Sequence, residues 1–458
     1  MIAVIIVLLC VVLLASVVAP VAAQPAAAPQ FENGDVVAII GDSITHGRKY
    51  HRYLYEYYLT RFPERQIRFV NQGIAGDSAG GGLGRLQWDI LPWHPNAASI
   101  MFGMNDIGRG YYGKENPDQA TLDGRKRALD GHRANMDKLA QALIDNGCAK
   151  LIFVTPSPYD DTAEMAMENL YGCNAALAQC GEYGKELAAK YKAGVADVHG
   201  PMTALNLEHQ KTDPKFTIIG SDRVHPGDVG MLVMAYYYLK AQGVPALVSK
   251  IAINGAKVDV VNAEVTGLKA SDQGVEFDCL EKALPWPIEA SAKEALALVP
   301  FEADLNQEQF SATLPAGNYK LLIDGQEVGQ YSAEALKSGI NLAANDKTPQ
   351  YKQALQVCQV NATRFNTEVS LRTYAQMKIG LVRDKINEED TAAVDAYFDN
   401  FMSKVGDSMR PYYTNQINVY KKTRPEIANI KQQIDTLQQQ LWQLNQPTVH
   451  HWQLMKVG

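Results

Sequence analysis

Between residues 34 and 245, short apolar runs alternate with longer segments in which apolar positions recur every three or four residues. The short runs contain almost no polar residues, as is typical of parallel strands that are buried on both faces. The predicted strands are residues 36–40, 67–70, 98–102, 151–155 and 194–198, and the main predicted helices are residues 50–61, 122–144, 165–191 and 229–241. This alternation predicts a doubly wound parallel sheet with helices on both faces.

The pattern changes after Pro245. Residues 250–345 carry short runs in which apolar and polar residues alternate, separated by turn dipeptides such as Asn254-Gly255 and Asp324-Gly325, and they predict a small β-rich domain. From Thr348-Pro349 onward the spacing becomes helical, with Thr348 as the predicted N-cap. Residues 346–458 are therefore predicted to form a C-terminal helical region.

The last predicted helix begins at Thr423-Arg424-Pro425-Glu426, which has the sequence of a capping box. Its apolar positions then alternate spacings of three and four: Ile427, Ile430, Ile434, Leu437, Leu441 and Leu444. This seam is shorter than the roughly three to four heptads of a stand-alone coiled coil. A helical hairpin that packs within the same chain is therefore favoured over a dimerisation zipper.

Residues 1–23 have the features of an export segment. Residues 2–19 are apolar except for Ser16, and Val21-Ala22-Ala23 places small residues before Gln24, as signal peptidase requires. No Lys or Arg precedes this long apolar run, so an uncleaved anchor that tethers the protein to a membrane is the alternative to a cleaved signal peptide. Residues 24–33 are the predicted linker, and both alternatives predict a protein that is secreted, periplasmic or held at the cell surface.

Composition supports a folded protein with more than one domain. The chain has 458 residues, of which 47% are hydrophobic and 20% charged, and such a length exceeds that of a single hydrophobic core. A formal net charge of −7 and the lack of basic recognition motifs exclude nucleic acid as an expected partner. The cysteines outside the export segment are scattered without CxxC spacing, which indicates neither a disulfide framework nor a metal site.

Polar residues follow directly after three of the predicted strands. Ser43 follows the first strand, Gly76 lies in a glycine-rich stretch after the second, and Asn105 follows the third. Because the carboxyl ends of parallel strands share the edge where open α/β sheets bind ligands, we expect these residues to meet. Singly, serine and asparagine are also common in turns and helix caps. Phosphate binding is not favoured, because the first strand is followed by Gly-Asp-Ser rather than a nucleotide-binding loop.

A histidine lies three residues after an aspartate in Asp222-Arg223-Val224-His225-Pro226, just before the helix predicted at 229–241. In such a pair the carboxylate orients the imidazole while the other ring nitrogen takes the proton of a serine hydroxyl. An N-capping aspartate beside a surface histidine is the structural alternative.

Together these blocks resemble the SGNH, or GDSL-type, hydrolase family. The matching stretches, in the family's order, are Gly41-Asp42-Ser43-Ile44, Gly76 within residues 71–76, Gly103-Met104-Asn105-Asp106 and Asp222-Arg223-Val224-His225-Pro226. The resemblance covers about residues 34–245, and Ile44 stands where many members have leucine. It implies a three-layer flavodoxin-like α/β fold and hydrolysis of carboxylic esters by a serine, with no metal or other cofactor.

The resemblance also implies a role for each matching residue. Ser43 is the expected nucleophile, His225 the general base and acid, and Asp222 the carboxylate that orients His225. The expected oxyanion hole combines the backbone N–H groups of Ser43 and Gly76 with the side-chain amide of Asn105.

Other histidines are weaker candidates. His199 follows a predicted strand and is expected to be structural, because Asp197 is poorly placed to orient its ring. His46 either contacts a leaving group or caps a helix. His450-His451 has no accompanying carboxylate or cysteine cluster and is predicted to lie in a solvated tail.

For an exported member, the resemblance implies a small-molecule or polysaccharide ester as substrate, most often an acetyl or other short acyl group on a carbohydrate. Four aromatic residues near the predicted crevice suit stacking on sugars or belong to the core: Trp88, Trp93, Tyr111 and Tyr112. A lysophospholipase- or thioesterase-like activity is the alternative within the enzyme class, and a non-catalytic surface binding protein is the alternative outside it. The sequence does not indicate an oligomeric state.

Overall fold

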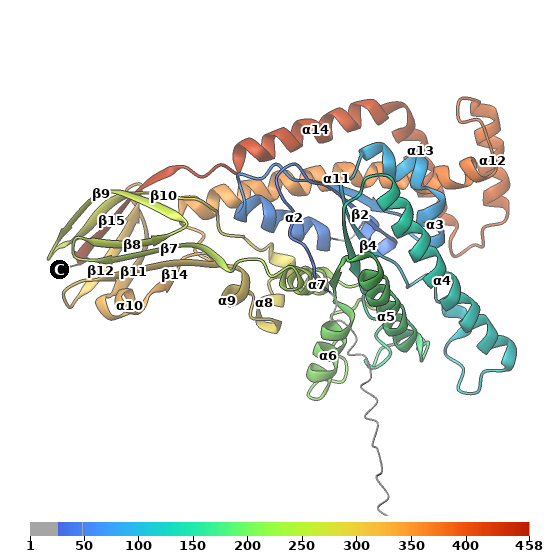
Figure 1. Ribbon diagram of the computed structural model, residues 1–458, viewed down its shortest axis with the longest axis horizontal. Helices are drawn as coiled ribbons and strands as arrows, with labels where there is room; N and C mark the ends of the chain where they lie inside the picture. Colours follow the sequence, from blue (N-terminus) through green and yellow to red (C-terminus); the bar gives the residue numbers. More distant parts are fainter. Residues whose placement is uncertain (1–25, 48, 458) are drawn as a thin grey trace, which may run out of the picture.

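The structure is a computed structural model that describes residues 26–47 and 49–457 (Figure 1). The predicted export segment, residues 1–23, lies outside this part of the chain. Within the described residues, no helix has both the length and the apolar character that a membrane span needs.

A parallel sheet forms the centre of the first domain, with the strand order β1-β6-β5-β4-β2-β3. Its strands are β1 (Ala26–Ala27), β2 (Val36–Gly41), β3 (Arg68–Gly73), β4 (Ala97–Met101), β5 (Lys150–Val154) and β6 (Gly194–Ala196). The chain moves from β2 outward to β3 and then returns to the other side of β2 at β4. The carboxyl end of β2, where Ser43 follows, is thus a point at which the strand order reverses.

Helices cover both faces of this sheet, which gives the three-layer fold predicted from the sequence (Figure 1). They are α2 (Tyr50–Arg61), α4 (Gln119–Asp145), α5 (Cys173–Tyr191), α6 (His199–Gln210) and α7 (Asp228–Ala241). Alternate β2 residues point to opposite faces: Val37 and Ile39 share a core with α2 and α7, whereas Ala38 and Ile40 share one with α4 and α5.

The helix predicted at residues 165–191 begins later in the structure than the sequence pattern predicts. Residues 165–172 are not helical, and α5 begins only at Cys173 after Gly172, which has a φ of +90°. The guanidinium of Arg223 donates hydrogen bonds to the carbonyl oxygens of Ala163, Met165 and Met167. These tertiary bonds hold the segment as a loop and outweigh its helical pattern.

Two sheets pack face to face in the β-rich domain, with the orders β13-β12-β15-β10-β9 and β14-β11-β7-β8. Their strands are β7 (Leu247–Asn254), β8 (Lys257–Val261), β9 (Ala263–Ser271), β10 (Gly274–Glu281), β11 (Gln307–Thr313), β12 (Asn318–Ile323), β13 (Gln326–Ser332), β14 (Ile340–Asn341) and β15 (Val449–Val457). Phe277, Phe310 and Trp452 lie together in the core between the sheets.

The end of the chain differs from the prediction. Residues 346–458 are not helical throughout, because β15 lies between β10 and β12 in the β-rich domain. His450 and His451 therefore do not belong to a solvated tail: their Nδ1 atoms lie 2.7 Å from carboxylate oxygens of Asp324 and Asp278, respectively. Burial of Trp452 and Leu454 in the core explains why this segment pairs as a strand.

Four helices connect the β-rich core to β15: α11 (Pro349–Arg383), α12 (Thr391–Ser403), α13 (Arg410–Thr423) and α14 (Ile427–Leu444). Thr348 caps α11 as predicted, by accepting a hydrogen bond from the Tyr351 N–H. The capping box at residues 423–426 does not form, because Thr423 ends α13 and a 3₁₀ turn leads into α14. The seam of α14 packs against α11 and α2 of the same chain, with Ile434 and Leu441 buried.

The long helix α11 also covers the edge strand β3 (Figure 1). The Glu368 carboxylate accepts a hydrogen bond from the Asn71 N–H (2.8 Å), and the Arg364 guanidinium donates one to the Phe69 carbonyl oxygen (3.2 Å). Polar side chains of a helix thus satisfy backbone groups that an open sheet edge would leave to solvent. This arrangement brings α11 beside the carboxyl end of β3.

Candidate active site

Ser43 is the first residue of α1 (Ser43–His46), and only Asp42 separates it from the end of β2. Asp42 caps this short helix by accepting a hydrogen bond from the Ile44 N–H (2.9 Å). Gly41 permits the tight turn, since a Cβ at this position would lie 2.3 Å from Thr45 Oγ1. Burial, together with repulsion from Asp106 and Asp77, raises the pKa of Asp42 to about 7. The strand end and the cap fix the backbone that carries the Ser43 hydroxyl.

A continuous hydrogen-bonded chain links Ser43, His225 and Asp222. Ser43 Oγ lies 2.8 Å from His225 Nε2, and His225 Nδ1 lies 2.6 Å from Asp222 Oδ2. Asp222 Oδ1 accepts the backbone N–H groups of Val224 (3.0 Å) and His225 (2.9 Å). Partial burial favours the neutral acid, but these hydrogen bonds outweigh it and lower the pKa of Asp222. The carboxylate is therefore charged at neutral pH and fixes the imidazole.

Arg223, between the aspartate and the histidine, shapes this loop. Its φ is +62°, a left-handed conformation that costs a non-glycine residue about 1–2 kcal/mol. Its buried guanidinium donates to the carbonyl oxygens of Asp160 (2.8 Å) and Ala163 (3.0 Å), which offsets that cost. The backbone on the other side is held by a hydrogen bond from the Gly220 N–H to the His225 carbonyl oxygen (2.7 Å). Sequence reasoning missed this anchoring role, because only the folded loop brings the carbonyls to Arg223.

The predicted oxyanion residues line the same cavity as Ser43 and His225. Gly76 has a φ of +81°, which favours glycine, in the turn after β3. The Asn105 Nδ2 donates a hydrogen bond to the Asp77 carbonyl oxygen (2.8 Å), and its second proton remains available. Ser43 lies in the first helical turn, where a backbone N–H has no intrahelical acceptor. The three residues thus line one cavity, and each has an N–H group that is a candidate oxyanion donor.

His46 connects α1 to the glycine-rich turn. Its Nδ1 accepts a hydrogen bond from the Ala75 N–H (3.0 Å), and its Nε2 lies 3.3 Å from Thr373 Oγ1 on α11. Burial, with repulsion from Arg372 and Arg85, lowers the pKa of His46 to about 3. The ring is thus neutral at physiological pH and carries its proton on Nε2, toward Thr373. His46 supports the residue next to Gly76.

A buried cluster of two arginines and two aspartates holds the other side of the turn. Arg85 pairs with Asp77 (2.8 Å) and with Asp89 (2.7 Å), and Arg372 of α11 pairs with Asp89 (2.6 Å). Burial opposes ionisation of Asp89, but both arginines outweigh it and lower the pKa of Asp89. The cluster fixes α11 against the segment that follows Gly76.

The cavity at the Ser43 hydroxyl has a volume of about 590 Å³ and walls from two parts of the chain. One wall comes from the α/β domain and includes Ser43, Gly76, Asn105, Arg109 and His225. The other wall comes from the C-terminal helices: Val369, Thr373 and Gln376 of α11, Met409 before α13, and Tyr412, Tyr413 and Gln416 of α13. No sequence signal pointed to this second wall, since helical spacing alone does not reveal what a helix packs against.

Other candidates lie away from this cavity. Trp88 and Trp93 line a separate small cavity with Leu371 of α11. Tyr112 is buried in another apolar cluster and Tyr111 is exposed. His199 Nε2 lies 3.0 Å from Asn174 Oδ1, and burial lowers the pKa of His199. Within the described residues, all five cysteines are free.

Comparison with known proteins identifies the family of this chain. Residues 39–233 match the GDSL-like Lipase/Acylhydrolase family. A solved structure of a gut microbial diltiazem-metabolizing enzyme is 32% identical and has a TM-score of 0.87, with 94% of this chain and 99% of that chain covered. An acetylxylan esterase of Geobacillus stearothermophilus is 25% identical over 229 residues, which are 46% of this chain and 95% of that protein. The chain belongs to the SGNH, or GDSL-like, lipase and acylhydrolase family, and it is a hydrolase that acts on ester bonds.

Proposed function

We propose that this protein is an exported serine esterase that removes acetyl or other short acyl groups from carbohydrates, with Ser43, His225 and Asp222 as its catalytic triad. The observation that carries the proposal is the 2.8 Å contact between Ser43 Oγ and His225 Nε2, with Asp222 on the other ring nitrogen. These are the distances that proton transfer from a nucleophilic serine requires.

In the proposed mechanism, Ser43 Oγ attacks the ester carbonyl carbon while its proton passes to His225 Nε2. The tetrahedral oxyanion accepts hydrogen bonds from the N–H groups of Ser43 and Gly76 and from the Asn105 amide. When the carbon–oxygen bond to the alcohol breaks, Nε2 returns the proton to the leaving alkoxide. Water then attacks the acyl-enzyme, with His225 as base, and releases the carboxylic acid and free Ser43.

Both the cavity and a relative support a short acyl group and a polar alcohol. Of the residues that line the cavity, Thr373, Gln376, Tyr412 and Gln416 provide polar side chains. Val369 and Met409 add apolar lining, and the polar side chains suit an alcohol portion that carries hydroxyl groups. The acetylxylan esterase relative covers 46% of this chain, and the family match at residues 39–233 includes all the proposed catalytic residues.

A series of nitrophenyl esters tests the activity. We expect hydrolysis to be fastest for acetyl or propionyl and to fall as the acyl chain lengthens, and Ser43→Ala to abolish it. Ser338→Ala is the matched control, since this serine is exposed at the end of α10 (Ala333–Ser338) in the β-rich domain. Equal hydrolysis by Ser43→Ala and the wild type would falsify the assignment.

Natural esters then separate the substrate classes. Acetate release from acetylated polysaccharide supports the carbohydrate esterase, and diltiazem is a second probe because a relative metabolizes it. Release of fatty acid from lysolipid in preference to acetate from polysaccharide would replace the proposal by the lysophospholipase alternative.

The proposal that the protein is exported depends on residues 1–23. Sequencing the N-terminus of the protein recovered from its native host distinguishes cleavage near residue 23 from retention as an anchor.

A further inference from the structure

Arg109 is a cation in the cavity for which the proposed mechanism has no use. It lies in a 3₁₀ turn (Arg109–Tyr111) four residues after Asn105, on the loop that follows β4, and it lines the cavity with Ser43 and His225. Among the described residues, no carboxylate forms an ion pair with its guanidinium and no acceptor takes a hydrogen bond from it.

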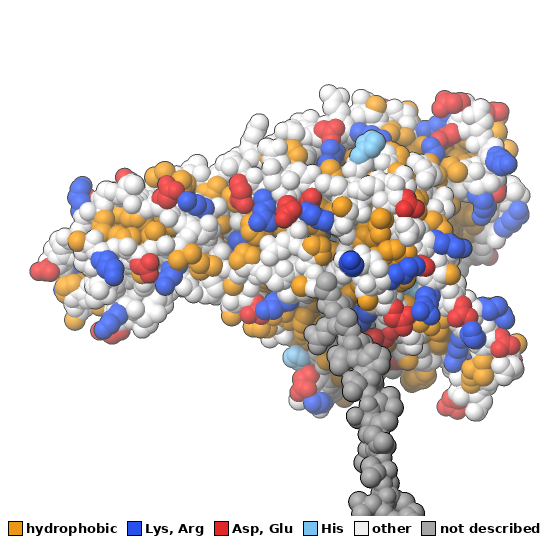
Figure 2. Space-filling view, in the orientation of Figure 1, with side chains coloured by type: hydrophobic (Ala, Val, Ile, Leu, Met, Phe, Trp, Pro, Cys, Tyr) orange, Lys and Arg blue, Asp and Glu red, His pale blue; other side chains and the backbone are white. Residues whose placement is uncertain are grey.

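The described walls of the cavity carry no negative side chain that compensates this charge. No aspartate or glutamate is among the described residues of the cavity walls. Of the two histidines there, His46 is neutral because burial lowers its pKa to about 3. Both ring nitrogens of His225 lie within hydrogen-bond distance of Ser43 or Asp222. By contrast, basic and acidic side chains are interspersed on the surface face shown in Figure 2. Among the described residues that line the cavity, Arg109 is thus the one with a fixed charge, and that charge is positive in a protein whose net charge is −7.

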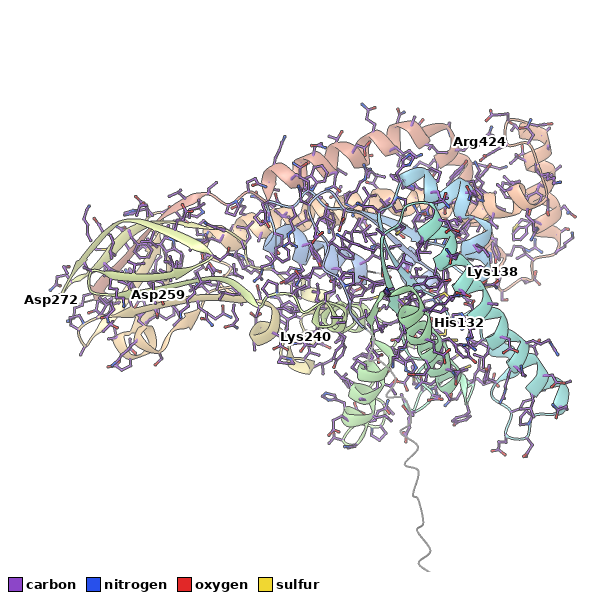
Figure 3. All side chains as sticks on the ribbon, in the orientation of Figure 1. His132, Lys138, Lys240, Asp259, Asp272 and Arg424 are labelled. Atoms are coloured by element: carbon purple, nitrogen blue, oxygen red, sulfur yellow. The ribbon has the colours of Figure 1, made fainter. Side chains whose placement is uncertain are left out.

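The loop that carries Arg109 is held in place. The Asp106 carboxylate accepts a hydrogen bond from the Ala79 N–H (2.9 Å). It also lies 3.2 Å from Nδ1 of His132 on α4 (labelled in Figure 3). The Ile107 N–H donates to the Gly103 carbonyl oxygen (3.0 Å), and the Ile107 side chain is buried. A guanidinium on a fixed loop makes a bidentate contact with a carboxylate at a low entropic cost.

We propose that Arg109 selects esters whose alcohol portion carries a carboxylate, such as an O-acetylated sugar acid or an acetylated aromatic acid. This inference rests on the proposed esterase function and names its substrate class. The bound carboxylate lies against Arg109 while the ester carbonyl lies at Ser43 and Asn105, since the same loop positions Asn105 and Arg109 four residues apart.

A structural role is the competing explanation. Asp42 lies behind the nucleophile, and the charge of Arg109 opposes the rise of its pKa, although burial and the neighbouring aspartates have larger effects. If Arg109 served only to stabilise the charged form of Asp42, replacing Arg109 would slow the hydrolysis of charged and neutral esters by the same factor. The ratio of the two rates separates the explanations.

Matched pairs of esters measure that ratio. One pair is 4-acetoxybenzoate and the neutral 4-acetoxybenzamide, and the other is a mono-O-acetylated methyl glucuronoside and the corresponding methyl glucoside. For at least one pair, we expect the kcat/KM of the wild type to be about tenfold or more higher for the acid than for the neutral ester. A preference of this size corresponds to the free energy of one hydrogen bond to a charged group. We expect added salt to lower this ratio, because ions screen the attraction.

The variants identify the residue responsible. We expect Arg109→Gln to bring the ratio close to one and Arg109→Lys to keep part of it, whereas Arg133→Gln, an exposed arginine on α4, keeps the wild-type ratio. If Arg109→Gln does not fold, the salt dependence of the wild-type ratio and the Arg109→Lys ratio provide the test. A preference in only one pair supports the inference and shows whether the acid is a sugar or an aromatic.

Two results overturn the inference. A wild type that hydrolyses neutral and acidic esters equally, or an Arg109→Gln variant that keeps the full preference, shows that Arg109 does not recognise a carboxylate. A wild type with no Ser43-dependent hydrolysis of any of the four esters overturns the proposed function itself, and the inference falls with it.

Discussion

The side chain of Gln376 on α11 donates a hydrogen bond to the carbonyl oxygen of Ala75, 2.9 Å away, immediately before Gly76. The N–H of the same residue, Ala75, donates to His46, which in turn contacts Thr373 on α11. Both backbone polar groups of Ala75, next to the proposed oxyanion hole, are therefore tied to α11: the carbonyl oxygen directly and the N–H through His46. The C-terminal helices support the active site as well as forming a wall of its cavity.

Gln376→Leu should impair catalysis more than folding. The variant keeps the side-chain volume but removes the donor to Ala75, so Gly76 loses part of its support. We expect kcat to fall by a few-fold to about tenfold, with a loss of unfolding free energy of about 1 kcal/mol, as for one hydrogen bond. Steady-state kinetics and denaturant unfolding measure the two effects. Gln359→Leu, an exposed position on the same helix, is the control. Identical kinetics in the two variants would show that α11 does not act on the turn.

Asn105→Ala tests the proposed oxyanion hole. Its amide is expected to bind the oxyanion more strongly than the ground-state ester, so kcat should fall by about 10²–10³ while KM changes little. Asn400→Ala, an exposed site on α12, should match the wild type. A variant that raised KM without lowering kcat would assign Asn105 to substrate binding alone.

The α/β domain was largely predictable because its determinants are local. Each buried strand is a continuous apolar run. Ser43, two residues after β2, becomes part of the site because parallel strands end at one edge. The Ser43 and His225 segments lie 182 positions apart, yet the strand order brings them together. The helix at residues 50–61 was predicted with its observed ends.

The second wall of the site and the last strand were not predictable from local pattern. Glu368 reaches Asn71 across 297 positions, and nothing in the spacing of α11 indicates which strand edge it satisfies. The segment of β15 contains two adjacent histidines, and its partners β10 and β12 precede the whole helical region. Both errors concern contacts that exist only after distant segments have folded together.

A buried carboxyl pair makes stability depend on pH. Glu281 and Glu308 are both buried near the start of α11. Glu281 accepts a hydrogen bond from Gln350 (2.6 Å). Within the described residues, neither side-chain oxygen of Glu308 has a hydrogen-bond partner. Burial raises the pKa of Glu281, and burial together with repulsion from Glu281 raises the pKa of Glu308 well above its usual value. The folded state therefore holds protons that the unfolded chain releases.

Glu308→Gln should consequently stabilise the protein more as the pH rises. For a carboxyl with a raised pKa, the stability present below the unfolded pKa is lost as the pH increases toward the folded pKa. The amide cannot ionise, so the variant should gain in Tm relative to the wild type from about pH 5 to pH 8, above the ordinary glutamate pKa. Thermal unfolding across this range measures the difference, with the exposed Glu115→Gln as control. A difference in Tm that is constant with pH would show that Glu308 ionises normally.

Trp452→Ala tests whether β15 is essential to the β-rich domain. Trp452 is fully buried and packs against Phe277 and Phe310, with ring centroids 5.7 and 5.3 Å away. Its removal leaves a cavity between the two sheets and should lower the free energy of unfolding of this domain by about 3–5 kcal/mol. Met455→Ala lies on the same strand but is 53% exposed, so it should cost little. Chemical unfolding monitored by tryptophan fluorescence and circular dichroism compares them. Equal stability of the two variants would mean that the sheets do not depend on the C-terminal strand for their core.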